Sequence, residues 1–232
     1  MLQKKDDGTH SYSPFLKGKP WPLGSSLTPR GVNFAVTATD ASKIELLLFS
    51  NEDSKEPNTI IDLNKSNHNN NYWHIEVTGI GEGTLYAYRV FRDSNLDKNI
   101  SKKILLDPCA RAITGWNSYK RSSCVGNINN INSCLKGIVC EREEFDFISH
   151  PRPQHKWSNT IIYELHVGGF TKDPKANVSS SKRGTLIALK EKIPYLKELG
   201  ITTIELLPIF AFDPSDAPLG RKNFWGYSPI NW

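Results

Sequence analysis

The first half of the chain carries short hydrophobic runs that alternate with polar residues and are separated by turn-forming residues. Val32, Phe34 and Val36 alternate with small or polar neighbours, the period of two that indicates a strand with one buried face. The same alternation recurs around Trp73, whereas residues 44–49 form a nearly continuous hydrophobic run that is typical of a central strand. The pattern predicts strands near residues 31–38, 43–49, 72–77 and 85–91.

The last of these strands has one face that we expect to be buried. Tyr86, Tyr88 and Val90 lie on that face, because successive side chains of a strand point to opposite sides. Ala87 and Arg89 lie on the other face, and we expect them to be less buried. Short strands at this spacing favour an all-β, immunoglobulin-like sandwich of roughly 100 residues.

The pattern changes near residue 160, where a strand, a helix and a second strand are predicted. Residues 161–167 have the character of a buried strand. Residues 185–199 carry leucine and isoleucine at three- and four-residue spacing, which indicates a helix with one hydrophobic face. Residues 201–207 form another hydrophobic strand. This order predicts two parallel strands joined by a right-handed crossover, with the helix over one face.

Two residues set limits on the predicted helix. Pro194 cannot donate a backbone hydrogen bond, so we expect a kink there, or a new helix with Pro194 at a first helical position. Gly200 is well placed to cap the C-terminal end. Residues 160–232 have room for about two strand–helix units, whereas a closed eight-stranded α/β barrel needs about 250 residues. We therefore expect an incomplete α/β segment.

The composition excludes several classes of protein. Hydrophobic residues make up 38% of the chain and charged residues 23%, unlike disordered, collagen-like or coiled-coil sequences. The net charge of +5 comes from single or paired basic residues rather than a stripe, so we expect no nucleic-acid ligand. No hydrophobic run approaches the roughly 20 residues of a membrane-spanning helix, so we expect no membrane association. The N-terminus lacks the hydrophobic centre of a secretory signal, which favours a cytoplasmic protein.

The four cysteines are Cys109, Cys124, Cys134 and Cys140. No pair has the short spacing of a zinc site, so we expect no metal site. In a cytoplasmic chain such cysteines are expected to be free, partly buried thiols.

Six segments of the chain resemble, in order, one family of glucan-processing enzymes. Residues 17–49, 73–90 and 105–113 (LLDPCARAI) are similar to the sandwich module of carbohydrate-binding family 48 in isoamylase-type debranching enzymes of glycogen and starch. The start of the glycoside hydrolase family 13 barrel resembles residues 161–171 (IIYELHVGGFT), 184–213 and 223–232 (NFWGYSPINW).

The resemblance covers the chain from about residue 17 to its end and implies an order of domains. It implies a leader at 1–19, a carbohydrate-binding-module-like β-sandwich at 20–115, an inter-domain connection at 116–158, and the first two strand–helix units of a truncated TIM-barrel catalytic domain at 159–232.

The sequence departs from the family pattern at a few positions. Cys109 stands where the family usually has tyrosine, Phe147 where tryptophan is common, and Gly168 where arginine is frequent. These are packing or peripheral changes. The larger departure is length, because the catalytic carboxylates of the family come from segments after the fourth and fifth barrel strands, and a third essential aspartate follows the seventh.

The resemblance implies a debranching enzyme that hydrolyses α-1,6-glucosidic branch linkages with retention and without an organic cofactor. An α-glucan is the implied ligand. We expect this chain alone to be inactive, and a complementing C-terminal fragment is a possible partner. Two alternatives stay open: a non-catalytic glucan-binding or regulatory module, and the remnant of a split gene.

Tyr227 is the candidate substrate-binding residue. The matching tyrosine in the family stacks on the glucose ring next to the cleavage point, and an aromatic face suits the apolar face of a sugar. The predicted position beyond the second barrel strand agrees with the face on which active sites of such barrels form. None of the acidic residues is predicted to be catalytic: Asp107 is expected to stabilise a turn, and Glu164 and Glu205 to have buried structural partners.

Three tryptophans are possible glucan platforms in the sandwich. Trp73 alternates in phase with Ile75 and Val77, so we interpret it as a core residue. Trp21 lies between prolines, and Trp116 follows the last family-48 segment. The sequence does not identify a carbohydrate site among them.

Overall fold

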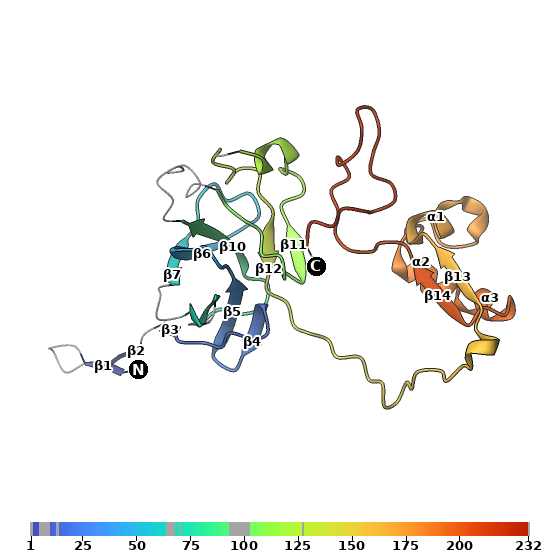
Figure 1. The fold of residues 1–232 in the computed structure, drawn as a ribbon, viewed down its shortest axis with the longest axis horizontal. Helices are drawn as coiled ribbons and strands as arrows, with labels where there is room; N and C mark the ends of the chain where they lie inside the picture. Colours follow the sequence, from blue (N-terminus) through green and yellow to red (C-terminus); the bar gives the residue numbers. More distant parts are fainter. Residues whose placement is uncertain are drawn as a thin grey trace. The chain divides into compact units, whose positions relative to one another are not determined.

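The structure is a computed structural model that describes residues 2–4, 10–12, 14–63, 68–69, 71–92, 103–126 and 128–231. The chain divides into two compact units, residues 1–143 with 231–232, and residues 144–230. The first, unit 1, consists mainly of β-strands, and the second, unit 2, combines two strands with short helices (Figure 1). No helix in the described part of the chain is long and apolar enough to cross a membrane.

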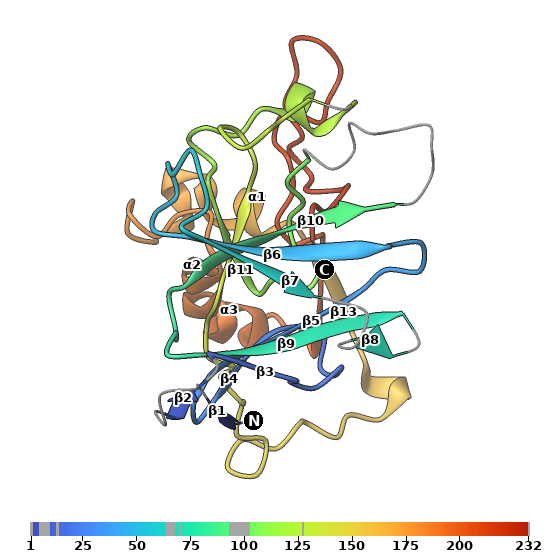
Figure 2. The ribbon, with the colours of Figure 1, turned by 90° about the vertical axis from the view of Figure 1, so that its left-hand side faces the viewer.

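Unit 1 is built around two antiparallel β-sheets (Figure 2). The first sheet has the strand order β11-β12-β10-β6-β7, and the second has the order β3-β9-β5-β4 with β8 paired to β9. The strands of the first sheet are β6 (Lys43–Phe49), β7 (Thr59–Leu63), β10 (Leu85–Phe91), β11 (Ala112–Thr114) and β12 (Lys136–Ile138). Those of the second are β3 (Phe15–Leu16), β4 (Gly24–Thr28), β5 (Gly31–Thr37), β8 (His68–Asn69) and β9 (Tyr72–Thr78). A separate pair joins β1 (Leu2–Lys4) to β2 (His10–Tyr12).

The four strands predicted from the sequence are confirmed as β5, β6, β9 and β10. The main core lies between the two sheets and is made of apolar side chains from these strands and from β7. Tyr86 and Tyr88 of β10 are buried in this core, as predicted. Val90 and Arg89 are both half-buried, so the expected difference between them is absent. The alternation therefore identified correctly that the tyrosines at the centre of β10 face the core.

The outer face of the first sheet is also covered, which the sequence pattern did not predict. Ala87 is fully buried, so the expectation that it would be less buried than the tyrosines is wrong. It belongs to a second hydrophobic cluster with Leu47, Phe49, Ile104 and Cys134. The last two residues come from the segment after β10, which packs against the outer face of β6 and β10. A period of two distinguishes the faces of a strand but does not show which distant segment covers them.

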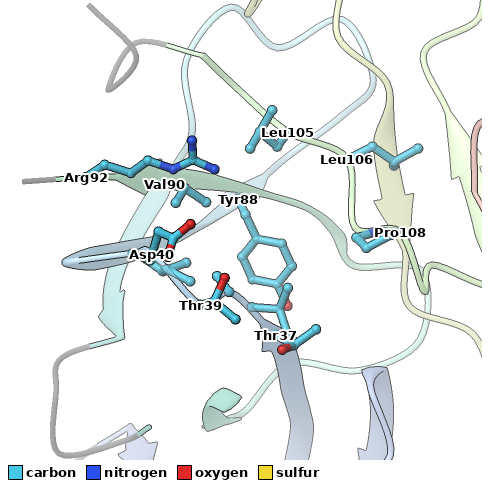
Figure 3. Close-up of a pocket in the computed structure, with 13 residues that line it drawn as sticks. Thr37, Thr39, Asp40, Tyr88, Val90, Arg92, Leu105, Leu106 and Pro108 are labelled. Carbon is cyan, nitrogen blue, oxygen red and sulfur yellow. The ribbon is translucent and has the colours of Figure 1, made fainter. Parts of the chain in front are cut away.

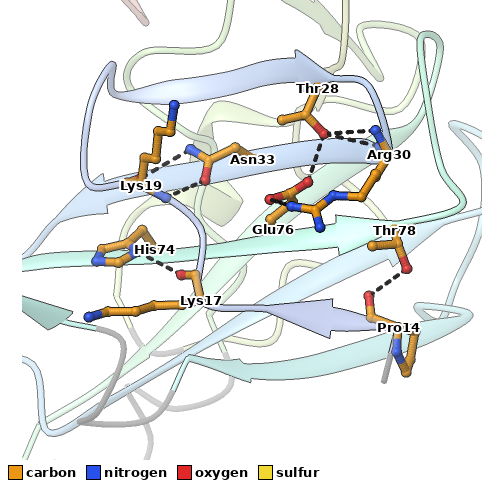
Figure 4. Close-up of polar contacts among 10 residues, drawn as sticks. Pro14, Lys17, Lys19, Thr28, Arg30, Asn33, His74, Glu76 and Thr78 are labelled. Carbon is orange, nitrogen blue, oxygen red and sulfur yellow. Dashed lines mark hydrogen bonds and ion pairs between the residues drawn. The ribbon is translucent and has the colours of Figure 1, made fainter. Parts of the chain in front are cut away.

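The outer face of the second sheet is covered by the segment that follows β3. Asn33 Oδ1 accepts a hydrogen bond from Lys19 N at 2.7 Å, and Asn33 Nδ2 donates to Lys19 O at 3.1 Å (Figure 4). His74 Nδ1 donates to Lys17 O at 2.8 Å. Both polar side chains are buried because backbone groups of residues 17–19 satisfy their hydrogen-bonding capacity.

Unit 1 extends past residue 115. The 3₁₀ helix η3 (Arg121–Cys124) and strand β12 lie in the stretch 116–158 that the sequence predicts as an inter-domain connection. Strand β12 pairs with both β10 and β11, so this part of the stretch is integrated into the first sheet.

Unit 2 contains a parallel pair of strands, β13 (Ile162–Leu165) and β14 (Thr203–Leu206). Between them the chain forms α1 (Val167–Lys172), α2 (Leu186–Glu191) and α3 (Ile193–Glu198). Two 3₁₀ helices complete the unit, η4 (Trp157–Asn159) and η5 (Pro174–Ala176). The predicted strand–helix–strand order and parallel pairing are confirmed, whereas α1 was not predicted. Its short sequence, VGGFTK, contains two glycines, which weaken a helical signal.

The predicted helix over 185–199 is divided into two at Pro194. Helix α2 ends before Lys192, and α3 begins at Ile193 with Pro194 in its first turn, where a missing N–H costs no helical hydrogen bond. Gly200 follows the end of α3 with a φ of +87°. Gly200 N donates to Lys197 O and Ile201 N donates to Leu196 O, both at 3.0 Å. These two bonds form the Schellman motif of a glycine-capped helix. The predictions of a new helix at Pro194 and of a cap at Gly200 are therefore both confirmed.

The strands of unit 2 are covered on one face only. Leu165, Leu189 and Leu196 form a small core between the strands and the helices. Ile162 is 55% exposed, so the buried character predicted for residues 161–167 is wrong at the start of that strand. Glu164 and Glu205 are also exposed, and they lie opposite each other in the ladder. The prediction of buried partners for these two carboxylates is therefore wrong in the structure as described.

Candidate functional site

A cavity of about 460 Å³ lies at the carboxyl ends of the two parallel strands of unit 2. Its lining comes from the residues that follow β13, from the start of α2, and from the segment that follows β14. The side chains that bear on its chemistry are His166, Lys172, Thr185, Lys222, Asn223 and Phe224. Ligand sites of parallel α/β folds form at this edge, because the loops after the strands meet there.

His166 is fixed at the edge of this cavity. It caps α1, with its Nδ1 accepting a hydrogen bond from Gly169 N at 2.9 Å, so the proton of the neutral ring is on Nε2. Its ring lies 4.6 Å from that of Phe224 and 5.5 Å from that of Trp225, measured between centroids. A Cβ at Gly168 would meet His166 Cε1 at 3.0 Å, so a larger residue there would displace the imidazole. The arrangement offers aromatic faces and an N–H donor.

Tyr227 does not line this cavity. Its side chain is 58% exposed, and it lies in the turn between Gly226, with a φ of +78°, and Ser228, with a φ of +64°. Asn223 Nδ2 donates to Tyr227 O at 2.7 Å, which fixes the turn next to the lining residue Phe224. An exposed aromatic ring is available to stack on a ligand, and its role stays a prediction.

Among the described residues that line the cavity there is no carboxylate. Asp213 is buried near it, but Asp213 Oδ1 accepts hydrogen bonds from Ser215 N at 2.8 Å and from Ser215 Oγ at 2.6 Å. That carboxylate therefore stabilises a turn. Among the described residues no group of three or more His, Cys, Asp or Glu side chains is arranged to hold a metal ion.

The tryptophans of unit 1 differ in accessibility. Trp73 is 3% exposed and donates from Nε1 to Ala38 O at 3.2 Å, which confirms it as a core residue. Trp21 is 67% exposed. Trp116 is partly exposed and packs edge to face against Tyr119, with 5.7 Å between the ring centroids.

Asp107 stabilises a turn, as predicted. Its side chain is fully buried; Oδ1 accepts from Cys109 N and Oδ2 accepts from Tyr86 Oη, each at 2.8 Å. Burial raises the pKa of this carboxyl, although both hydrogen bonds act in the opposite direction. The residue links the turn after β10 to the core of the sandwich.

Comparison with known proteins gives a consistent result. Residues 22–110 match the model of carbohydrate-binding module 48, the isoamylase N-terminal domain. The glycogen debranching enzyme of Pectobacterium atrosepticum is 34% identical over 225 residues, which are 92% of this chain and 33% of that protein. The glycogen debranching enzyme of Dickeya chrysanthemi is 32% identical over 227 residues, which are 93% of this chain and 33% of that protein. Residues 22–110 therefore belong to carbohydrate-binding module family 48, and the chain is similar to the N-terminal third of glycogen debranching enzymes.

The chain spans about a third of the length of the curated relatives that it matches. Among solved structures, the pullulanase from Bacillus acidopullulyticus is similar with a TM-score of 0.65 at 24% identity, over 90% of this chain and 24% of that one. The Paenibacillus barengoltzii pullulanase in complex with maltohexaose and α-cyclodextrin gives 0.64 at 21% identity, over 92% of this chain and 32% of that one. These likenesses show the fold.

From the sequence we selected Tyr227, which lies near the cavity, and missed two residues that line it. His166 and Phe224 were within segments that resemble the family, but neither was selected. The signal that could identify His166 is its position at the C-terminal end of the predicted strand 161–167, since parallel strands bring such residues to one edge.

Proposed function

We propose that this chain provides the glucan-binding module and the first barrel strands of an α-1,6-glucan debranching enzyme, and that it does not hydrolyse glucan by itself. The domain order predicted from the sequence, with a sandwich at 20–115 and barrel units at 159–232, is part of this proposal. The cytoplasmic location stays a prediction.

Binding of α-glucan is supported by the family of residues 22–110, which is a carbohydrate-binding module by name. It is also supported by structural neighbours that were solved with maltotetraose or maltohexaose bound. Tyr227 is proposed to stack on a sugar ring in the complete site, together with the aromatic group formed by His166, Phe224 and Trp225.

The absence of catalysis is supported by the lining of the unit 2 cavity, and this observation carries the proposal. Retaining glycosidases need two carboxylates about 5–5.5 Å apart, one as nucleophile and one as acid and base. The cavity at the strand ends has histidine, lysine, threonine and aromatic side chains but no carboxylate. It lacks the groups that break a glycosidic bond.

A complementing polypeptide that supplies further strands would fit the open face of β13 and β14. Ile162 is exposed on this face. In an all-parallel sheet both faces and both edges are normally covered. We propose that the remaining barrel strands of the family occupy this position in the active enzyme.

The test is a long incubation of the purified chain with amylopectin. We expect no increase in reducing ends and no change in the iodine spectrum, for the chain and equally for Tyr227→Ala. Addition of a polypeptide that carries the remaining barrel strands of a relative is expected to restore turnover. Turnover by the chain alone that survives repurification would contradict the proposal.

The single alternative with structural support is a non-catalytic glucan-binding module. The same lack of carboxylates in the cavity favours it. Failure of every complementing polypeptide to restore turnover, with glucan binding retained, would favour this alternative.

A further inference from the structure

Unit 1 has a second cavity, of about 380 Å³, at one end of the sandwich. It is formed by the end of β5, the connection to β6, the last residues of β10 and the segment 105–108 (Figure 3). Its volume lies in the range of small-molecule sites, about 300–1,000 Å³. No residue of this cavity contributes to the site in unit 2.

The buried hydroxyl of Tyr88 has no hydrogen-bond partner in the described part of the chain. Tyr88 lines the cavity and is 2% exposed. The contrast with Tyr86 is direct, since Tyr86 Oη donates to Asp107 Oδ2 at 2.8 Å. A buried hydroxyl without a partner is destabilising, and native proteins keep few of them. Burial also raises the pKa of Tyr88 well above its ordinary value, so the hydroxyl is a donor at neutral pH.

The walls of the cavity are held in place by backbone hydrogen bonds. Tyr88 N donates to Leu105 O at 2.9 Å, and Leu105 N donates to Tyr88 O at 2.8 Å. On the opposite side, Ala38 N donates to Asn71 O at 2.9 Å and Ala38 O accepts from Trp73 Nε1 at 3.2 Å. A cavity whose walls are fixed before binding loses little conformational entropy when a ligand enters.

The lining combines apolar surfaces with groups that bind hydroxyls. Val90, Leu106 and other aliphatic side chains provide the apolar part. Asp40 and Arg92 line it as well, and both are exposed at its rim. A carboxylate accepts hydrogen bonds and a guanidinium donates them, and together they add no net charge. This combination suits a neutral molecule with several hydroxyls and an apolar face, rather than an anion or a cation.

We propose that this cavity binds a small neutral saccharide of one or two sugar units, with a sugar hydroxyl accepting a hydrogen bond from Tyr88 Oη. The inference rests on the proposed function for the class of ligand, and it adds a site within the sandwich that is distinct from Tyr227. The cavity opens at one end of the sandwich, where Asp40 and Arg92 are exposed, so it admits a free sugar or a chain end.

The experiment compares two tyrosine-to-phenylalanine variants of the full chain. Tyr88→Phe removes only the unpartnered hydroxyl, and Tyr86→Phe removes the hydroxyl that is paired with Asp107. Tyrosine rings are labelled with ¹³C, the Tyr88 signals are assigned by their loss in Tyr88→Phe, and glucose and maltose are titrated. We expect the Tyr88 signals of the original chain to shift with maltose. Calorimetric titration of each protein with maltose gives the affinity, which we expect to fall about tenfold in Tyr88→Phe and less than twofold in Tyr86→Phe.

Thermal melting without sugar provides a second measurement. Tyr88→Phe is expected to melt at the same temperature as the original chain or higher, and Tyr86→Phe lower, because only the latter loses a hydrogen bond. Equal maltose affinity in Tyr88→Phe, or unshifted Tyr88 signals at saturating sugar, would overturn the proposal and leave an internal water as the partner of this hydroxyl. Glycogen binding, measured on the same samples, separates the cavity site from the proposed function of the chain in glucan binding. Glycogen binding without a Tyr88 shift rejects the cavity site alone, and a Tyr88 shift without glycogen binding rejects the proposed function alone.

Discussion

The fully buried carboxyl group of Asp107 makes the stability of unit 1 depend on pH. Asp107 is held by two hydrogen bonds, from Tyr86 Oη and Cys109 N, yet burial raises its pKa. The folded chain therefore holds this proton more tightly than the unfolded chain does. Its contribution to stability is present below the unfolded pKa of about 3.9 and is lost as the pH rises through the higher folded pKa.

Asp107→Asn tests this directly, because asparagine keeps the shape and cannot ionise. We expect the melting temperature of the variant, relative to the original chain, to rise as the pH is increased from 4 to 7. Thermal unfolding of both chains at each pH gives the difference. A difference that does not depend on pH would show that Asp107 ionises in the folded chain as easily as in the unfolded one.

Side chains such as Asn33 and Ala87 show where sequence reasoning fails at this scale. The alternation along each strand puts both side chains on outer faces, and both are buried. Asn33 is covered because it bonds to the backbone of Lys19, and Ala87 because the segment after β10 packs over it. These contacts join residues far apart in sequence, so no local pattern contains them.

At the scale of elements, the sequence predicted helix boundaries correctly where these depend on the backbone chemistry of one residue. Pro194 began a new helix and Gly200 capped it, because the missing N–H and the left-handed φ are properties of these residues alone. Helix α1 was missed because its sequence has no helical periodicity. The cavity at the strand ends was foreseen only as a general consequence of parallel strands.

Gly200→Ala is expected to destabilise unit 2 by about 1 kcal/mol, because a residue with a Cβ is strained at a φ of +87° although the space around it is open. For a unit of this size the melting temperature is expected to fall by roughly 4–8 °C. Circular dichroism at 222 nm follows the change. Gly81→Ala is the matched control, since Gly81 also has open space and no left-handed φ, and we expect no change there. Equal effects of the two substitutions would contradict the role of Gly200 as a cap.

At the scale of the whole molecule, the two units differ in how completely they bury their strands. Unit 1 covers both faces of β6 and β10 in its first sheet, whereas in unit 2 one face of the pair β13 and β14 leaves Ile162 exposed. Exposed apolar strands with open edges favour association.

A shorter chain that ends near residue 150 is therefore expected to remain monomeric at concentrations where the full chain associates. Size-exclusion chromatography with light scattering compares the two. Ile162→Lys in the full chain is the matched variant, and we expect it to reduce association. The same degree of association in all three proteins would show that the open face of unit 2 does not cause association.

The most direct test of the account is cosedimentation of the full chain with glycogen, with dextran as the control polymer. We predict that the chain sediments with glycogen, that free maltoheptaose releases it, and that dextran leaves it in the supernatant. A chain that stays in solution with glycogen at every concentration tested would contradict the proposal that it is the glucan-binding part of a debranching enzyme.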